Sequence, residues 1–276
     1  MPEREETKGK IMDTLGLITN VPYSTGLDYQ LRIHQGVANA SGDESKCADI
    51  IARGFDWAEV KPLLDKGEEG YRILARKYKS IINMFEMSCV KIVAIASNAF
   101  HVICDYGLTD GTSVQFLHIV DPLVKEIKKF EETKCVGVLG GRTVMEHPFY
   151  LSRLNAAGYE TIVPDKKEDR DFVHSLVTSK EIKPANPNIP IHVRWRIYEI
   201  MSNLKKDGAD GIIFACPNLQ KVINLVDKGE NGKFALRPGD SQVHLGSNSN
   251  NMRVFDASAI HIDEIVRRML SGYVKQ

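Results

Sequence analysis

The sequence lacks a long apolar run, an excess of charge of one sign, and closely spaced cysteines. No apolar stretch approaches the roughly 20 residues that span a bilayer, which argues against a membrane protein. Lys plus Arg and Asp plus Glu both number 36, so the formal net charge is zero. A neutral chain has no electrostatic reason to bind nucleic acid or an anionic membrane.

Disulfide and metal-binding patterns are also missing. The five cysteines are odd in number and widely spaced, with no CxxC motif, and the opening MPEREETKGK has no apolar secretion segment. These features predict free thiols in a reducing compartment, the cytoplasm. The eight histidines show no HExxH or paired spacing, so no metal site is indicated.

Short apolar runs alternate with helical patterns along the chain. Strands are expected at 12–19, 47–55, 90–97, 116–120, 135–140, 159–165 and 211–215. Helices are expected at 23–37, 57–88, 145–158, 168–178 and 192–208, the second interrupted at Pro62 and Gly67. This alternation predicts an α/β fold with mostly parallel sheets and right-handed crossovers.

Two segments of the first half of the chain resemble two segments of the second half. TLGLITN resembles CVGVLGG, and VKIVAIASNAFHVI resembles DGIIFACPNLQKVI. The second pair places Ser97 and Cys216 at matching strand ends, 119 positions apart. The pattern predicts two similar three-layer α/β/α halves related by pseudo-two-fold symmetry, with an active-site cleft between them.

Cys216 follows the apolar run GIIFA, where a helix is about to begin. A lone cysteine there is most often a packing residue, but a thiol with a reference pKa of about 8.5 also suits proton transfer near neutrality. Ser97 is likewise either a helix N-cap or a catalytic hydroxyl. Asn98 and Asn218, in the loops SNAFH and CPNLQ, are candidate donors to a substrate carboxylate.

Six segments together carry a family resemblance. They are SNAFH (97–101), FLHIVD (116–121), VGVLGGRTVMEHPFYLSRL (136–154), GADGIIFAC (208–216), ACPNL (215–219) and VFDASAIHIDEIV (254–266). In their order and separation they resemble the aspartate/glutamate racemase superfamily over roughly residues 14–270, the segment near 229–250 excepted. SNAFH stands where the family has Cys or Thr, then Asn-Thr and a His, and ACPNL stands at its Gly-Cys-Thr-Glu. The last segment keeps Asp256 and His261.

The resemblance implies a cofactor-independent isomerase, without pyridoxal phosphate, that racemises or epimerises a small amino acid or carboxylate. In this Ser/Cys variant Cys216 is the principal acid/base, which deprotonates the L-substrate, and Ser97 lies on the other face. The residues implied in substrate binding are Thr19, Asn20, Arg53, Asn98, Arg142, Thr143 and Asn218.

The expected organisation is a first α/β domain of residues 11–117 plus 251–276, a second of 118–228, and an irregular insertion loop at 229–250. The resemblance also implies a homodimer.

Several positions depart from the family pattern. Ser97 replaces a cysteine with a hydroxyl that is a much weaker acid, and Ala99 and Pro217 replace threonines. The loop GGRTV replaces a more hydroxyl-rich loop of the family, and LITNVPYST replaces its N-terminal Gly-Gly-Met loop. Two alternatives therefore stay open. One is a one-thiol decarboxylase or isomerase of a small dicarboxylate, since arylmalonate decarboxylases of this superfamily keep only the second cysteine. The other is a catalytically inactive, racemase-like binding protein.

Overall fold

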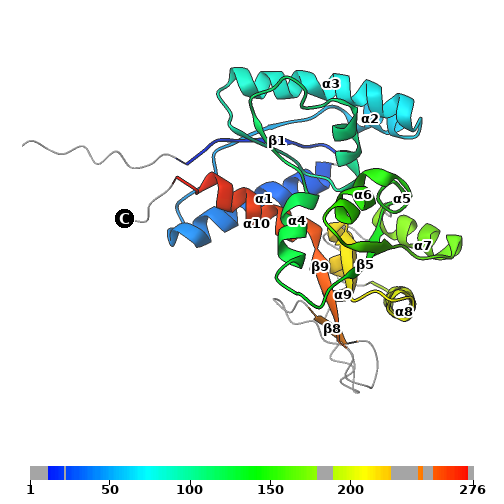
Figure 1. Cartoon of the computed structure of the whole chain (residues 1–276). Helices are drawn as coiled ribbons and strands as arrows, with labels where there is room; N and C mark the ends of the chain where they lie inside the picture. The colour runs from blue at the N-terminus through cyan, green and yellow to red at the C-terminus, as the bar shows by residue number, and fades with distance from the viewer. Residues whose placement is uncertain (1–11, 22, 179–188, 225–241, 245–250, 273–276) are drawn as a thin grey trace, which may run out of the picture. The chain divides into compact units, whose positions relative to one another are not determined.

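The computed structural model describes residues 12–21, 23–178, 189–224, 242–244 and 251–272. The chain divides into two compact units, each with one sheet (Figure 1). The first unit comprises the described residues up to Ala96, Tyr106–Leu117, and those from Ile262 onward. The second comprises Ser97–Asp105 and the described residues of His118–His261.

The first sheet is parallel throughout, with the strand order β2-β1-β3-β4. Its strands are β1 (Leu15–Ile18), β2 (Ile50–Arg53), β3 (Ile92–Ile95) and β4 (Gln115–Leu117). The helices are α1 (Tyr23–Ser41), α2 (Trp57–Leu64), α3 (Glu68–Met87) and, from Ile262 onward, α10 (Ala257–Met269). A 3-10 helix, η1 (Ala99–Tyr106), follows β3.

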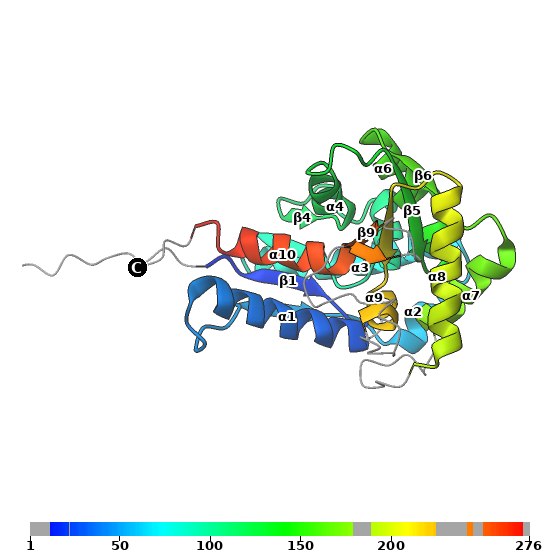
Figure 2. The same cartoon turned by 90° about the horizontal axis from the view of Figure 1, so that it is seen from below.

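Side chains of β1 alternate between the two faces of this sheet, as strand geometry requires. Leu15 packs with Ile33 of α1 and Ile265 of α10 in one buried cluster. A Cβ on Gly16 would instead meet the Phe85 ring of α3 at 2.6 Å. Helices α1 and α10 therefore cover one face and α3 covers the other, and Figure 2 shows α10 beside α1 and β1. The first unit has three layers.

The second sheet has the strand order β6-β5-β7-β9-β8 and is parallel except for the edge pair β8–β9. Its strands are β5 (Cys135–Gly140), β6 (Glu160–Ile162), β7 (Gly211–Ala215), β8 (Gln242–His244) and β9 (Asn251–Asp256). The helices are α4 (Val120–Ile127), α5 (Arg142–Glu146), α6 (Pro148–Ala156), α7 (Lys167–Thr178), α8 (Ile191–Lys206) and α9 (Pro217–Asn224).

Helices flank this second sheet as well. A buried cluster joins Leu139 and Phe214 of the sheet to Val173 of α7, Met201 of α8 and Leu219 of α9. Helices α4 and α6 lie on the other side of the sheet from α8 in both views (Figures 1 and 2). These layers, like those of the first unit, come from strands whose two faces are both apolar.

The two sheets repeat one topology. The order β2-β1-β3-β4 matches β6-β5-β7-β9, with an additional strand, β8, at the edge of the second sheet. Strands β3 and β7 begin at Ile92 and Gly211, 119 positions apart, which is the offset between Ser97 and Cys216. The predicted α/β fold with two similar halves is confirmed.

Two groupings differ from the expected boundaries. Residues 251–261 group with the second unit, where β9 pairs with β7, and residues 97–105 also group with it, whereas both were expected in the first. Within the expected insertion loop, residues 242–244 form β8 against β9. Its remaining residues, 229–241 and 245–250, lie outside the described part of the chain.

The predicted interruption at Pro62 was wrong, although the one at Gly67 is confirmed between α2 and α3. Helix α2 runs through Pro62, which removes only one backbone N–H from the ladder. The Asp56 carboxylate caps its start by accepting a hydrogen bond from Ala58 N at 3.0 Å, and Val60 is fully buried. Cap and burial outweigh the lost hydrogen bond.

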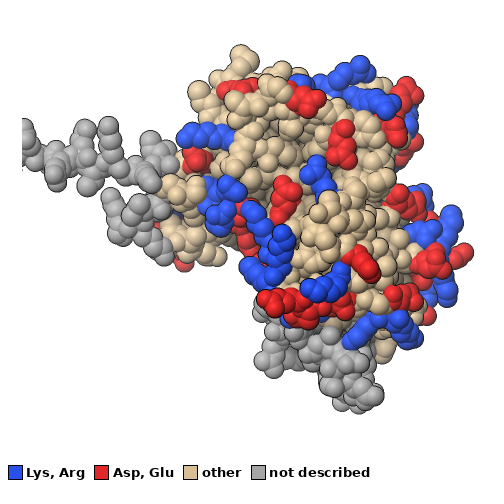
Figure 3. All heavy atoms as spheres, in the orientation of Figure 1, with Lys and Arg blue, Asp and Glu red and all other residues tan. Residues whose placement is uncertain are grey.

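Acidic and basic side chains are interspersed on the face seen in Figure 3, in keeping with the balanced composition. Among the described residues, no helix combines the length and apolar character needed to cross a membrane.

Replacing Gly54 by Ala is expected to destabilise the first unit. The added Cβ would lie 2.1 Å from the Thr19 carbonyl oxygen, and a backbone atom cannot turn aside as a side chain can. We expect the free energy of unfolding to fall by about 1–3 kcal/mol, measured by urea denaturation. Gly141→Ala is the control, because its Cβ would meet only Val177, at 3.7 Å. Equal losses in the two variants would contradict the prediction.

Candidate functional site

The carboxyl ends of β5, β7 and β9 lie side by side in the second sheet. Gly140 pairs with Ala215, and Phe214 pairs with Asp256, so the residues that follow these strands share one edge. Helices α5, α9 and α10 all begin there. Helix N-termini carry partial positive charge and unpaired N–H groups, which favour anions. This edge is therefore suited to a carboxylate or a thiolate.

Cys216 stands at this edge, between β7 and α9. Cys216 forms no disulfide and is partly exposed, it packs against the core, and its carbonyl accepts a hydrogen bond from Leu219 N at 3.1 Å. Pro217 occupies the first position of α9, which suits a residue without an N–H. The predicted strand, cysteine and helix are confirmed. By contrast, burial raises the pKa of the Cys104 and Cys135 thiols and keeps them protonated.

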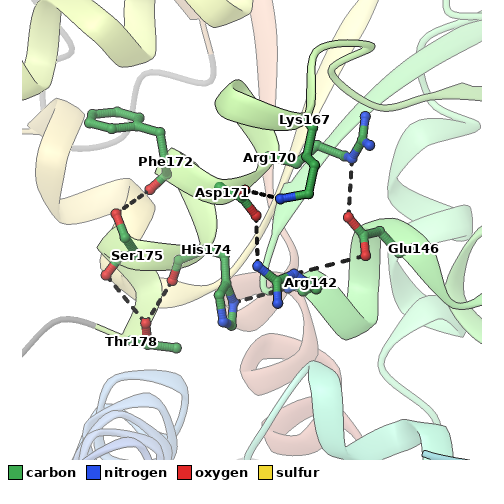
Figure 4. Close-up of polar contacts among 9 residues, drawn as sticks. All are labelled: Arg142, Glu146, Lys167, Arg170, Asp171, Phe172, His174, Ser175 and Thr178. Atoms are coloured by element: carbon green, nitrogen blue, oxygen red, sulfur yellow. Dashed lines mark hydrogen bonds and ion pairs between the residues drawn. The ribbon is translucent and has the colours of Figure 1, made fainter.

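Arg142 follows the neighbouring strand β5, but its side chain is engaged by α7 (Figure 4). The guanidinium donates to Asp171 at 2.6 Å and lies 3.9 Å from Glu146. The backbone N–H of Arg142 donates to His174 Nδ1 at 3.2 Å. Hydrogen bonds from Lys167 and then from Arg142 lower the pKa of Asp171. Arg142, which was predicted to bind a substrate carboxylate, is therefore bound to carboxylates of the protein itself.

Two other predicted residues lie close to the start of α5 or α9. Thr143 is partly buried and its carbonyl accepts from His147 N at 3.2 Å. Asn218, also partly buried, donates from Nδ2 to the Val177 carbonyl at 3.5 Å, which links α9 to α7. Arg142 of α5 and Asn218 of α9 therefore both contact the same helix, α7, and Cys216 immediately precedes α9.

Ser97 and Asn98 form the loop between β3 and η1. Ser97 is partly exposed and its Oγ accepts a hydrogen bond from Phe100 N at 3.4 Å, the geometry of a helix cap. Asn98 is buried; its Nδ2 donates to Ser258 Oγ at 3.0 Å, and its Oδ1 accepts from Tyr150 OH at 3.3 Å. The capping interpretation of Ser97 is confirmed, and the Asn98 amide is bound to protein groups.

His101 holds the same loop from within the core. Its Nε2 accepts from Ile119 N at 3.3 Å, so Nδ1 carries the proton and donates to the Ser97 carbonyl at 2.7 Å. The ring is fully buried, at 4.7 Å from the His118 ring and 5.7 Å from the His261 ring between centroids. Burial and then His261 lower the pKa of His101 to about 3. A neutral, fixed His101 is a structural member of the loop.

Three predicted residues lie in the first unit, at the carboxyl ends of β1 and β2. Thr19 is buried and its N–H donates to the Arg53 carbonyl at 3.0 Å. Asn20 adopts a left-handed conformation, with φ of 63°, which asparagine tolerates better than most residues. The Arg53 side chain is exposed, and its guanidinium has no hydrogen-bond or ion-pair partner among the described residues.

A cavity of about 570 Å³ in the second unit lies away from all of these residues. It is lined by the end of β6, the start of α7 and the last turns of α8, with Asp165, Lys166 and Asn203 among its polar groups. None of the predicted site residues lines it. The candidate site is therefore at the strand ends and not in this cavity.

Tyr150 and Ser258, which hold the Asn98 amide, were missed by the sequence interpretation. Ser258 lies inside VFDASAIHIDEIV, so the resemblance indicated its neighbourhood but not its contact. Tyr150 of α6 likewise lies inside VGVLGGRTVMEHPFYLSRL, 52 positions from Asn98, and the sequence pattern does not signal their hydrogen bond.

Stability is expected to fall as the pH drops below about 6.5, because the pKa of His101 is about 3 in the folded chain and 6.5 ordinarily. Between these values the unfolded chain binds a proton that the folded chain does not bind. The free energy of unfolding then falls by up to about 1.4 kcal/mol per pH unit for this histidine. Burial also lowers the pKa of His118, so its loss of stability at low pH adds to that of His101.

Urea denaturation between pH 7 and pH 5 measures this slope. His101→Asn, whose amide still carries a donor, should reduce the slope whatever its own stability. His192→Gln, at an exposed position, is the control and should leave the slope unchanged. An unaltered slope in His101→Asn would show that His101 is not the group that titrates.

Comparison with known proteins identifies the family through one family model and the fold through solved structures. The family model for Asp/Glu/Hydantoin racemase matches residues 69–230. No curated protein sequence matches the chain. Among solved structures, a candidate Asp/Glu racemase from Yersinia pestis is 24% identical, with a TM-score of 0.75 over 94% of this chain and 100% of that one.

Two further structures share the fold. An aspartate racemase homologue from Pyrococcus horikoshii OT3 is 19% identical, with a TM-score of 0.68 over 94% of this chain and 99% of the other. The aspartate racemase of Picrophilus torridus is 14% identical, with a TM-score of 0.61 over 96% of both chains. Because the family model covers more than half of the sequence, the chain belongs to the Asp/Glu/Hydantoin racemase family.

Proposed function

We propose that the protein is a cofactor-independent amino-acid racemase or epimerase of the aspartate/glutamate type, with Cys216 as its principal acid/base. The observation that carries the proposal is the position of the partly exposed Cys216 at the start of α9, on a strand-end edge where three helices begin. A helix N-terminus favours the thiolate, which is the form that removes a proton. Family membership supplies the reaction class.

In the proposed reaction the Cys216 thiolate takes the α-proton of an L-amino acid and becomes a thiol. The carbanion is protonated on its other face, by the Ser97 hydroxyl or by a water molecule, to yield the D-isomer. Backbone N–H groups at the helix starts are suited to bind the α-carboxylate. Thr19, Asn20, Thr143 and Asn218 remain candidate substrate ligands in this proposal.

One alternative is favoured by a specific observation. Ser97 Oγ caps η1, and the neighbouring Asn98 amide is held by Tyr150 and Ser258. If this loop contributes no proton, only Cys216 acts, and the enzyme is a one-thiol decarboxylase or isomerase of a small dicarboxylate. A racemase-like protein that binds a carboxylate without turnover is the remaining candidate.

Proton exchange in heavy water tests the proposal. Wild-type protein is expected to remove the α-proton NMR signal of L-aspartate or L-glutamate, and Cys216→Ala is expected to slow this loss by about 100-fold or more. Cys47→Ala is the matched control, because this exposed cysteine lies outside the site, and its rate should equal that of the wild type.

The stereochemistry of the product separates the candidates. Appearance of the D-isomer, even when slower than exchange, supports the racemase, and exchange that goes to completion without any D-isomer supports the one-thiol reaction. Absence of exchange with both substrates would contradict the aspartate/glutamate assignment.

We propose Arg53, in preference to Arg142, as the residue that binds a side-chain carboxylate of the substrate. The Arg53 guanidinium has no partner among the described residues, whereas Arg142 is bound by Asp171. Losing a charge-assisted hydrogen bond costs about 1.5–3 kcal/mol. Arg53→Gln should therefore raise KM by about 10- to 100-fold.

Steady-state kinetics check this prediction, and Arg142→Gln is the comparison variant, expected to keep KM within about 2-fold of the wild type. The reverse ranking of the two variants would return the role to Arg142.

We also propose a homodimer in the cytoplasm. The homodimer rests on the family resemblance, and the compartment on five cysteines, none of which forms a disulfide in the structure.

A further inference from the structure

Three buried side chains form a polar chain in the second unit, beside the loop that carries Ser97. Tyr150 OH donates to Asn98 Oδ1 at 3.3 Å, and Asn98 Nδ2 donates to Ser258 Oγ at 3.0 Å. Their exposed fractions are 0%, 5% and 1% for Tyr150, Asn98 and Ser258. Because buried polar groups are costly to leave unpaired, this chain holds its members in one arrangement.

Each end of the chain is attached to a rigid element. Tyr150 lies in α6, which is packed in the core, and Ser258 lies in the first turn of α10. The Asp256 carboxylate accepts from the backbone N–H groups of Ser258 and Ala259, both at 3.0 Å, and so caps α10. The Asn98 amide is therefore held between two helices, α6 and α10.

The held amide belongs to the residue next to Ser97. The Ser97 carbonyl is also bound, by His101 Nδ1 at 2.7 Å. The peptide unit between Ser97 and Asn98 is thus restrained from both sides, through one backbone carbonyl and one side-chain amide. The restrained peptide unit sets the direction of the Ser97 Cα–Cβ bond, and the hydrogen bond from Phe100 N to Oγ holds the hydroxyl oxygen about that bond.

We propose that Tyr150 and Ser258 are positioning residues that, through Asn98, orient Ser97 for protonation of the second face of the substrate. This rests on the proposed racemase function. It also assigns Asn98 to the protein scaffold, because both ends of its amide are used by Tyr150 and Ser258. Cys216 is carried by β7 and α9, whereas Asn98 lies in the same loop as Ser97, so we expect these residues to affect the first face less than the second.

The test compares two rates in heavy water for Tyr150→Phe and Ser258→Ala. The first rate is α-proton exchange in the L-substrate, which reports Cys216. The second is formation of the D-isomer, which reports the second face. We expect exchange within about 3-fold of the wild type and D-isomer formation slower by about 10-fold or more. Ser258→Thr, which restores a hydroxyl, should recover most of the second rate.

Tyr159→Phe and Ser175→Ala are the matched controls, because both residues lie in the second unit outside the chain of hydrogen bonds, and neither rate should change. Thermal unfolding of each variant identifies general destabilisation. An equal fall of both rates without rescue by Ser258→Thr would reduce the three residues to a structural role. Unchanged D-isomer formation would also overturn the proposal.

A second measurement separates this inference from the proposed function. Backbone hydrogen exchange at Phe100 and His101, whose N–H groups bond to Ser97 Oγ and the Asn98 carbonyl, should accelerate by about 10-fold in Tyr150→Phe and Ser258→Ala. If the wild type shows no turnover, the racemase assignment fails while this exchange still decides whether the two residues hold the loop. Unchanged exchange would show that they do not.

Discussion

Parallel pairing of β7 with β5 and β9 is the constraint on which the candidate site depends. Each strand satisfies its backbone hydrogen bonds with its neighbours, so the register in which Gly140 meets Ala215 and Phe214 meets Asp256 cannot slip without exposing apolar side chains. The register brings the starts of α5, α9 and α10 to one edge. This arrangement places the Cys216 thiol beside the starts of these helices, which an isolated GIIFAC segment could not do.

A different principle governs the loop at 97–101. Here polar groups are buried, and each has a partner: Asn98 binds Tyr150 and Ser258, and His101 binds the Ser97 carbonyl and Ile119 N. Desolvation keeps the imidazole neutral, which suits its role as donor at one nitrogen and acceptor at the other. The second unit thus contains a partly exposed thiol at one strand end and a loop fixed by buried hydrogen bonds.

Local patterns were sufficient to predict β1 to β7 and their duplication, because alternation and turn residues are short-range signals, but β8 and β9 were not predicted as strands. The 119-residue offset even anticipated the matching positions of β3 and β7. Long-range pairings were not readable. That β9 joins the second sheet, and that Tyr150 reaches Asn98, depends on how distant elements pack. Pro62 shows the same limit, since burial of Val60 and the Asp56 cap decide whether the helix tolerates it.

In the proposed racemase, the pairing of the Cys216 thiol with the Ser97 hydroxyl has a definite kinetic consequence. The two enantiomers of an amino acid have equal free energies in solution, so an asymmetric site cannot favour one of them at equilibrium. The kcat/KM values for the two directions must be equal, and a weak acid on one face slows both. Ser97 Oγ accepts a hydrogen bond from Phe100 N, which favours the negatively charged oxygen but leaves it far less acidic than a thiol. Transfer at the Ser97 face is then the slow step, and a proton on the Cys216 face exchanges with solvent many times before the configuration inverts.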